Sequence, residues 1–386
     1  MTQYRDNYQI QAAQAKARFL TYDQQELIER CKLSFDGDYL YTALFGEAYR
    51  ICRRSGDMQR QHWGRWVDAN GFAEVMTILD WLCDSRADRY ITGRYVNIVT
   101  QGHYFHRNLQ ETKEDPDAQL FTSHPEAFRA ACRALGGEPM DGADIGYAIE
   151  LLDGVKVFIK LWYGDEDFPA QVLCLWEENV LRYIRYETTW FALGLLIERI
   201  KENMPLETKR LLLRPWRQSD ARALYEYAKD PMVGPAAGWP VHTGVENSRQ
   251  IIENVLCVPE TYAVCMKEDD SPIGSIGLKL GEATDMTQRS DECELGYWLG
   301  KPFWGSGIIP EAAEALLRHA FEDLGMNAVW CGYYEGNQKS CRVTQKLGFT
   351  YHHRTEHVEV PLLGQVRTGH AVLLTKAQWE TNFRKE

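Results

Sequence analysis

The run from Trp304 to Glu311, Trp-Gly-Ser-Gly-Ile-Ile-Pro-Glu, contains residue types and spacings that suggest ligand binding. Gly305 and Gly307 allow the backbone to turn tightly and to approach a ligand without a Cβ in the way. Pro310 suits the first turn of a helix, where its missing N–H is no loss. The amides before that turn would then point outward at the positive end of a helix dipole. Such a site favours an anion, and a pyrophosphate in particular.

A simpler interpretation explains the same residues, because short glycine patterns recur by accident. In that interpretation the run is a strand-to-helix turn with no ligand. The run lacks the third glycine of a dinucleotide-binding fingerprint and the Lys-Ser/Thr pair of a P-loop. Neither of these two motifs is supported, and the choice between an anion site and a plain turn depends on the surrounding sequence.

Two other groups of polar residues have spacings that suggest metal binding. His352, His353 and His357 lie on a predicted strand, where only His353 and His357 would share a face. No cysteine or carboxylate set completes a site around them. The acidic residues 165–167 precede Phe168-Pro169, which is typical of a solvated hairpin tip. We therefore expect no metal.

The composition is that of a globular protein, with 45% hydrophobic and 25% charged residues over 386 positions. The net charge is −12 and both halves are acidic, so nucleic acid is not an expected partner. No stretch approaches the roughly 20 apolar residues that span a bilayer, and the N-terminus lacks the apolar core of a signal peptide. The ten cysteines include no Cys-x-x-Cys pair and are expected to be reduced. We expect a cytoplasmic protein that binds no membrane.

The elements that would position the Trp304–Glu311 run form an α+β pattern, in which helices interrupt a mixed, mostly antiparallel sheet. A glycine turn and a helix follow the strand that ends at Leu299. The predicted strands are Lys209–Arg214, Thr261–Lys267, Pro272–Leu280, Glu292–Leu299, Ala328–Tyr334, Tyr351–Val360 and Gln365–Leu374. The predicted helices are Ser219–Lys229, Glu246–Leu256, Pro310–Leu324 and Gln338–Leu347.

The preceding half has a different rhythm and predicts a separate α+β domain. Its predicted helices are Tyr8–Leu33, Ala73–Ser85, Pro125–Leu135 and Glu187–Asn203. Its strand-like runs are Tyr39–Arg53, which begins as strand, Gly154–Tyr163 and Ala170–Glu177. Proline disfavours helix in the residue before it, so Met204-Pro205 is the expected boundary. The predicted domains are therefore 1–204 and 205–386.

Several motifs of the second domain occur together in a characteristic order across roughly 180 residues, which a single coincidence does not supply. They are Glu207-Thr-Lys-Arg-Leu, Glu294-Leu-Gly-Tyr-Trp-Leu, Phe303-Trp-Gly-Ser-Gly, Asn337-Gln-Lys-Ser and Lys346-Leu-Gly-Phe. In this respect the chain resembles the GNAT superfamily of N-acetyltransferases, and within it the branch of the ribosomal-protein N-terminal acetyltransferases.

The resemblance implies acetyl-CoA as co-substrate and places its binding residues. Trp304, Gly305, Ser306, Gly307 and Ile308 would hold the pyrophosphate. The backbone of Tyr297, Trp298 and Leu299, at a strand end that splays from its neighbour in this fold, would pair with the pantetheine like an added strand. Asn337 and Ser340 would hold the pantetheine arm and the thioester. Asn337 is also simply a good N-cap, and the two roles are compatible.

The implied reaction is direct attack of a neutral primary amine on the thioester, without a covalent enzyme intermediate. It needs a base for the ammonium, donors for the oxyanion and an acid for the leaving thiolate. A backbone amide of the Tyr297–Leu299 strand is the expected donor to the thioester carbonyl. Glu294 is the candidate base, with a plain strand carboxylate as the alternative. Ser340 is the candidate acid, by its position in similar family members. Many relatives use a tyrosine further along this helix, but Thr344 stands at that place here.

The acceptor is expected to be a protein N-terminus or a small amine. Trp239 and His242, in the loop between the first two helices of the domain, are the candidate acceptor-binding residues. Packing of Trp239 against those helices is the alternative, and His242 is a second candidate base. A homodimer is one assembly that the sequence leaves open. The rival function is a binding protein that senses acyl-CoA with a catalytically weak fold, while the first domain docks a partner and transmits the signal.

The first domain, from about Leu40 to Ile200, resembles an uncharacterised prokaryotic family of unknown function. The matching pieces include Leu44-Phe-Gly-Glu-Ala-Tyr, Thr92-Gly-Arg-Tyr-Val, Leu161-Trp-Tyr-Gly-Asp-Glu-Asp-Phe-Pro-Ala and Tyr186-Glu-Thr-Thr-Trp. Trp162, Trp176 and Trp190 are expected to pack between a sheet and the last helix. Docking of the acceptor or of a partner protein is the alternative role.

Overall fold

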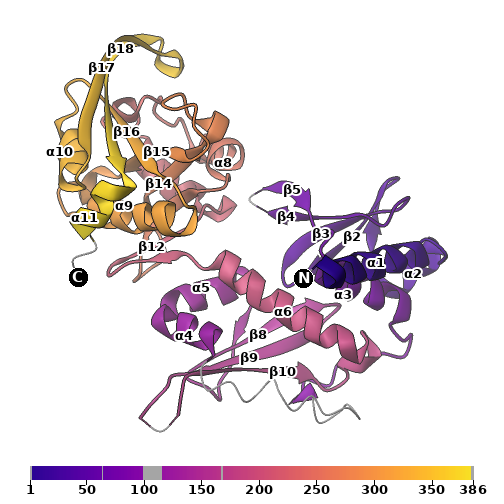
Figure 1. Cartoon of the computed structure of the whole chain (residues 1–386). Helices are drawn as coiled ribbons and strands as arrows, with labels where there is room; N and C mark the ends of the chain where they lie inside the picture. The colour runs from indigo at the N-terminus through magenta and orange to yellow at the C-terminus, as the bar shows by residue number, and fades with distance from the viewer. Residues whose placement is uncertain (1, 63, 99–114, 167, 384–386) are drawn as a thin grey trace. The chain divides into compact units, whose positions relative to one another are not determined.

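A helix end and a proline separate two structural units of this chain. Helix α6 (Tyr186–Asn203) ends before Met204, whose backbone is extended because the next residue is Pro205. Contacts group into Met1–Met204 and Pro205–Glu386. The computed structural model, drawn in Figure 1, describes residues 2–62, 64–98, 115–166 and 168–383. None of the helices described there is both long and apolar enough to cross a membrane.

The described residues of the first unit form two antiparallel five-stranded sheets and a set of helices. The sheets run in the orders β1-β2-β3-β4-β5 and β6-β10-β9-β8-β7. The helices are α1 (Thr2–Phe19), α2 (Gln24–Cys31), α3 (Phe72–Asp84), α4 (Pro116–Ser123), α5 (Pro125–Ala134), the short η2 (Val180–Arg182) and α6. The strands are β1 (Ser34–Phe35), β2 (Tyr39–Leu44), β3 (Glu47–Cys52), β4 (Met58–His62), β5 (Arg65–Asp68), β6 (Tyr95–Val96), β7 (Glu138–Pro139), β8 (Ile145–Leu152), β9 (Val155–Trp162) and β10 (Gln171–Glu177).

Two predicted elements of this unit are each divided by a turn. The predicted helix Tyr8–Leu33 is two helices, because the Asp23 carboxylate caps α2 by accepting the N–H of Gln25 at 2.8 Å. The predicted strand start at Tyr39 opens a hairpin, β2–β3, whose turn has positive φ at Phe45 (51°) and Gly46 (73°). A Cβ at Gly46 would lie 2.7 Å from the Leu135 carbonyl oxygen, so this close approach requires glycine.

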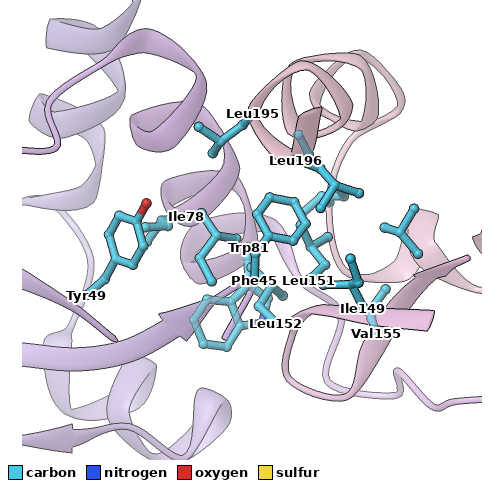
Figure 2. Close-up of a cluster of buried hydrophobic side chains, with 14 of the residues drawn as sticks. Phe45, Tyr49, Ile78, Trp81, Ile149, Leu151, Leu152, Val155, Leu195 and Leu196 are labelled. Atoms are coloured by element: carbon cyan, nitrogen blue, oxygen red, sulfur yellow. The ribbon is translucent and has the colours of Figure 1, made fainter. Parts of the chain in front are cut away.

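The core of the first unit joins both sheets to α3 and α6. Figure 2 shows Phe45, Trp81, Leu151 and Leu196 packed together, and each is at most 2% exposed. They come from the β2–β3 turn, α3, β8 and α6. Trp176 is also fully buried and Trp190 packs against the same core. Trp162 is half-buried, with the Lys160 ammonium 4.8 Å from its ring centroid.

The second unit contains one eight-stranded sheet in the order β11-β12-β13-β14-β15-β16-β18-β17. Only β15 and β16 are parallel among its described pairs, so the sheet is mixed and mostly antiparallel, as predicted. The strands are β11 (Leu206–Glu207), β12 (Leu211–Pro215), β13 (Thr261–Met266), β14 (Pro272–Leu280), β15 (Glu292–Leu299), β16 (Ala328–Tyr334), β17 (Thr350–Val360) and β18 (Gln365–Thr375). The α-helices are α7 (Ala221–Ala228), α8 (Val245–Ile251), α9 (Ile308–Arg318), α10 (Gln338–Lys346) and α11 (Lys376–Phe383). Figure 1 shows β17 and β18 as a long hairpin at one edge of this sheet.

The shorter segments of this unit are helical turns, and two of them change the predicted helices. The predicted helices Glu246–Leu256 and Pro310–Leu324 each finish in a π-helical turn, η5 (Ile252–Leu256) and η8 (His319–Asp323). The 3-10 turns are η3 (Gln218–Asp220), η4 (Pro235–Ala237), η6 (Gly281–Ala283), η7 (Lys301–Phe303) and η9 (Pro361–Leu363).

Candidate functional site

The parallel strands β15 and β16 separate before either of them ends. Their pairing stops at Leu295 and Cys331. Beyond that point β15 continues to Leu299 against β14, and β16 continues to Tyr334 against β18. The backbone of residues 297–299 therefore has no strand partner on the β16 side within the described chain. Apart from the Leu299 carbonyl oxygen, which accepts a side-chain hydrogen bond, the backbone groups here that point away from β14 are available to an extended ligand in the way that an edge strand offers them.

The loop that follows β15 offers a row of free backbone donors. Within the described residues, the N–H groups of the segment 305–309 make no hydrogen bond to the rest of the chain. Gly305 and Gly307 have φ of 78° and 79°, the left-handed conformation that glycine adopts without strain. A Cβ at Gly305 would meet no described atom within 4 Å, so the space in front of this loop is open. We call this segment, Trp304–Ile309, the amide loop.

The amide loop leads into α9, and residues between β11 and β12 anchor the first turn of that helix. The Glu311 carboxylate accepts the Thr208 hydroxyl at 2.6 Å, the Arg210 N–H at 2.8 Å and the Arg210 Nε–H at 2.7 Å. Burial alone would raise the pKa of Glu311, but these hydrogen bonds and the guanidinium charge lower it. Glu311 is therefore a fixed carboxylate in the first turn of α9, where the helix dipole favours a negative charge.

Arg210 also contacts the amide loop directly, a role that the sequence reasoning did not assign. Its Nη1 donates to the Ser306 carbonyl oxygen at 3.2 Å, and its Nη2 lies 3.7 Å from the position of a Cβ on Gly307. The side chain is 39% exposed, so its charge faces solvent next to the free amides. The sequence did contain a motif with Thr208 and Arg210, but its role becomes visible only through the contacts of these residues with Glu311 in the folded chain.

Trp304 ties the amide loop to the end of β15 and to α10. Its indole N–H donates to the Leu299 carbonyl oxygen at 2.8 Å. The Lys339 ammonium lies 3.3 Å from its ring centroid, a cation–π contact. Lys339 therefore adds a second positive charge beside the loop, which the sequence reasoning also missed.

Helix α10 begins beside the same loop, at Asn337. The Asn337 Oδ1 accepts the Ser340 N–H at 3.2 Å, so its N-cap role is confirmed. Ser340 is half-buried in the first turn of α10. Thr344 is buried and its hydroxyl donates to the Cys341 carbonyl oxygen at 3.0 Å, so this hydroxyl bonds within its own helix.

Glu294, the candidate base, lies in β15 where that strand is paired on both sides. The side chain is buried, with Lys279 donating to Oε1 at 2.8 Å and the Thr284 hydroxyl donating to Oε2 at 2.7 Å. Side chains alternate along a strand, so Glu294 and Trp298 face the same side of the sheet and Tyr297 faces the other. Glu294 is thus an ion-paired carboxylate and not a solvated surface residue.

Aromatic side chains gather on the Trp298 side of the sheet. The rings of Trp298 and Trp216 are stacked at 6.3 Å, and Trp239 meets Trp298 edge-on at 5.8 Å. Trp239 packs against the core formed by α7 and β13, as the packing interpretation predicted. His242 is buried, its ring lies 5.3 Å from that of Trp239, and its Nδ1 lies 2.8 Å from the Ser248 hydroxyl. Burial lowers the pKa of His242, which favours the neutral imidazole.

The loop that carries Trp239 also reaches the open ends of β16 and β18. Arg367 donates to the Pro235 carbonyl oxygen at 2.7 Å and lies 4.9 Å from the ring centroid of Tyr334. A Cβ on Gly238 would lie 2.9 Å from the Tyr334 hydroxyl. The predicted acceptor residues are therefore brought to the end of the sheet where β15 and β16 separate.

The two groups with metal-like spacing form no metal site among the residues that the structure describes. Bulges interrupt β17 at Tyr351/His353 and at Thr355/Val358, and His357 has φ of 61°. The simple alternation expected of the three histidines is therefore broken. In the acidic turn, Asp165 accepts the Phe168 N–H at 2.7 Å, and Asp167 lies outside the described residues.

Two family models match the chain, one in each unit. The model of the Acetyltransferase (GNAT) domain matches residues 210–350. The model of the Domain of unknown function DUF3786 matches residues 23–199, in agreement with the resemblance predicted for the first half. The first match contains the splayed strands, the amide loop and Ser340.

Curated relatives match the second unit. The uncharacterised N-acetyltransferase p20 of Bacillus licheniformis is 30% identical over 149 residues, which are 37% of this chain and 81% of p20. The uncharacterised N-acetyltransferase YnaD of Bacillus subtilis is 28% identical over 38% of this chain and 82% of YnaD. YdaF of the same organism, provisionally named a ribosomal N-acetyltransferase, is 38% identical over 21% of this chain and 42% of YdaF.

Among solved structures, a GNAT-family acetyltransferase from Bacillus anthracis covers 45% of this chain and 99% of its own, at 19% identity and a TM-score of 0.40. The family is shown by the sequence comparisons, since p20 is matched over four fifths of its length. With the geometry above, they lead to one conclusion: through its second unit, this chain belongs to the GNAT acetyltransferase family.

Proposed function

We propose that the second unit transfers the acetyl group of acetyl-CoA directly to a primary amine. The observation that carries this proposal is the row of free N–H groups in the amide loop, next to a strand end without a partner. The free donors suit a pyrophosphate, and the open strand end suits the pantetheine arm. Family membership points to the same co-substrate.

Positive charge supports the pyrophosphate assignment. Arg210 and Lys339 both contact the amide loop, the first through the Ser306 carbonyl oxygen and the second over the Trp304 ring. The chain as a whole is acidic, with a net charge of −12, so an anionic ligand needs such local attraction. In this proposal residues 304–308 hold the pyrophosphate, residues 297–299 pair with the pantetheine, and Asn337 and Ser340 lie next to the thioester.

The proposed chemistry uses groups from both faces of the sheet, near the point where β15 and β16 separate. The neutral amine attacks the thioester carbonyl carbon, a backbone N–H of residues 297–299 stabilises the oxyanion, and the carbon–sulfur bond then breaks. Ser340 gives its proton to the leaving sulfur. Glu294 takes the proton of the ammonium through a water, because each of its carboxylate oxygens accepts one protein hydrogen bond and has a further lone pair.

The acceptor is proposed to enter on the Trp298 side of the sheet. Trp298, Trp239 and Tyr334 form an aromatic boundary there, which suits the flat or apolar part of a peptide end or a small amine. The neutral imidazole of His242 is the second candidate base, and its Nδ1 is already near Ser248. We propose a cytoplasmic location, where acetyl-CoA and reduced thiols coexist.

Two observations favour the rival function, an acyl-CoA-sensing binding protein. Glu294 is held by Lys279 and Thr284, and Thr344 replaces the tyrosine expected on α10. A fold whose candidate base is already held by two hydrogen bonds, and which has no tyrosine acid on that helix, would bind acetyl-CoA without rapid turnover. In that case the first unit would report the bound state to a partner.

The test is the release of thiol from acetyl-CoA by the full chain with a panel of amines. The panel contains peptides with free N-termini, the same peptides with blocked N-termini and small primary amines. Amine-dependent thiol release, with one acetyl group gained by the free peptide or the small amine and none by the blocked peptide, supports the transferase. Tight binding of acetyl-CoA in calorimetry with no turnover on any amine overturns it in favour of the sensor.

A further inference from the structure

The hydroxyl of Tyr297 is a buried polar group that packing does not explain. Its oxygen is inaccessible to solvent and has no hydrogen bond of ordinary geometry with any described residue. Leaving such a hydroxyl unpaired costs about 1–3 kcal/mol, so it calls for a specific reason. A phenylalanine would fill the same space without this penalty.

Tyr297 also lies in the part of β15 that has no strand partner on the β16 side. It is the second residue of β15 beyond Leu295, where the pairing with β16 stops. Because side chains alternate, it shares the face of Leu295 and of its partner Cys331, opposite to Trp298 and Glu294. The side chain of Tyr297 therefore lies on the face of the sheet away from the predicted acceptor, next to the point where the two strands separate.

The side chains that influence the Tyr297 hydroxyl are neutral, and among them Ser340 is the candidate acid of the proposed reaction. Besides burial, Cys331, Ser340 and Cys341 influence the pKa of the Tyr297 phenol. Burial raises the pKa of the Tyr297 phenol, and the Ser340 hydroxyl opposes that rise. Burial also raises the pKa of the Cys331 thiol to about 12. At neutral pH the phenol is protonated and is a donor without a settled acceptor.

We propose that Tyr297 is a positioning residue for the reaction, acting through Ser340. Its O–H donates to the Ser340 oxygen when the thioester occupies the gap, and this turns the serine proton toward the sulfur. The inference rests on the proposed transferase function and adds to it the group that orients the acid. In this chain α10 has Thr344 in place of the tyrosine of many relatives, and the inference assigns a role in the same proton transfer to a tyrosine of β15.

The proton balance of this step is complete without a further reactant. The amine nitrogen bonds to the carbonyl carbon, the carbon–sulfur bond breaks, and its electron pair goes to sulfur. The sulfur takes the Ser340 proton while the Tyr297 O–H continues to hydrogen-bond the serine oxygen. That oxygen then regains a proton lost by the amine nitrogen, delivered through solvent, and Tyr297 keeps its own proton throughout.

The experiment compares the wild-type chain with Tyr297→Phe, Ser340→Ala and the double variant, with the best amine from the panel. We expect Tyr297→Phe to lower kcat about tenfold, to leave the KM for acetyl-CoA within about twofold, and to leave the melting temperature unchanged or raised. The double variant should be no slower than Ser340→Ala alone, because residues that act through one another are not additive.

Tyr262→Phe is the matched control from the same sheet. Tyr262 is also a buried tyrosine, but its hydroxyl donates to Glu260 at 2.9 Å, so its loss should lower the melting temperature and leave kcat unchanged.

The outcomes separate this inference from the proposed function. Active wild type with an unaffected kcat in Tyr297→Phe overturns the role of Tyr297 alone. The same holds if the two single effects multiply in the double variant. If the wild-type chain binds acetyl-CoA and acetylates no amine, the transferase itself is overturned, and the role of Tyr297 with it.

Discussion

Gly305→Glu is the substitution that most directly tests the amide loop. At φ of 78° any residue with a Cβ is strained, which costs about 1 kcal/mol of folding stability. No described atom lies within 4 Å of the new Cβ, so the side chain itself needs no rearrangement. The effect on binding should therefore come from the charge that is brought into the open space in front of the free N–H groups.

The expected magnitude follows from Coulomb's law. A carboxylate at ~8 Å from each of two pyrophosphate charges, with an effective dielectric constant of about 20, is repelled by about 2 kcal/mol per charge. Salt and solvent screen an exposed loop, and halving the total leaves about 2 kcal/mol, or roughly a thirtyfold weaker Kd. Isothermal titration calorimetry with acetyl-CoA measures this change.

Two variants make the result interpretable. Gly305→Gln has the same shape and backbone strain without the charge, and should weaken binding much less than Gly305→Glu. Gly325→Glu adds the same charge at another open glycine with φ of 69°, beyond the opposite end of α9, and should bind acetyl-CoA like the wild type. Equal affinities for Gly305→Glu and Gly305→Gln would refute the pyrophosphate assignment.

Three further predictions concern other parts of the chain. Glu294→Gln should lower kcat at least tenfold with nearly unchanged acetyl-CoA affinity, and a wild-type rate would remove Glu294 as the base. The pKa of His319 is raised in the folded chain because its ring hydrogen-bonds Glu260 and Asp323. The resulting stabilisation is complete at a pH below the pKa that this histidine has in the unfolded chain, and it is lost as the pH rises through the pKa that it has in the folded chain. Chemical denaturation from pH 6 to 8 should therefore show a decline in stability that His319→Gln lacks, and parallel profiles would contradict this origin. Arg199→Met should destabilise the first unit by about 3 kcal/mol or more, because it removes the ion-pair partner of the largely buried Glu74 and one of the two partners of Glu47, while acetyl-CoA titration of the second unit stays unchanged.

Arg199 belongs to an ion-pair network that no pattern in the sequence predicts. Arg199 pairs with Glu47 at 3.0 Å, Glu202 at 3.0 Å and Glu74, and Arg60 pairs with Glu47 and Glu202. These partners come from β3, β4, α3 and α6. In the sequence they are ordinary charged residues, and burial of the group follows only from the meeting of four elements.

The sequence by itself determined what depends on near neighbours. The glycines and proline of residues 305–310 predicted a tight turn into a helix, and Asn337 predicted a helix start, because backbone conformation and capping involve groups within a few residues. Hydrophobic periodicity located most strands of the second unit. Motif order located the family, since it needs only spacing along the chain.

Only the tertiary structure decided which groups meet. The pairing of β14 with β15 brings Lys279 to Glu294. The segment before β12 brings Arg210 to Ser306. Helix α10 brings Ser340 to Tyr297. A one-residue change of register would turn Tyr297 to the other face, so its role is invisible in the sequence. The amide loop was thus predicted as a local shape, and its charges and proton donors came from residues that folding places around it.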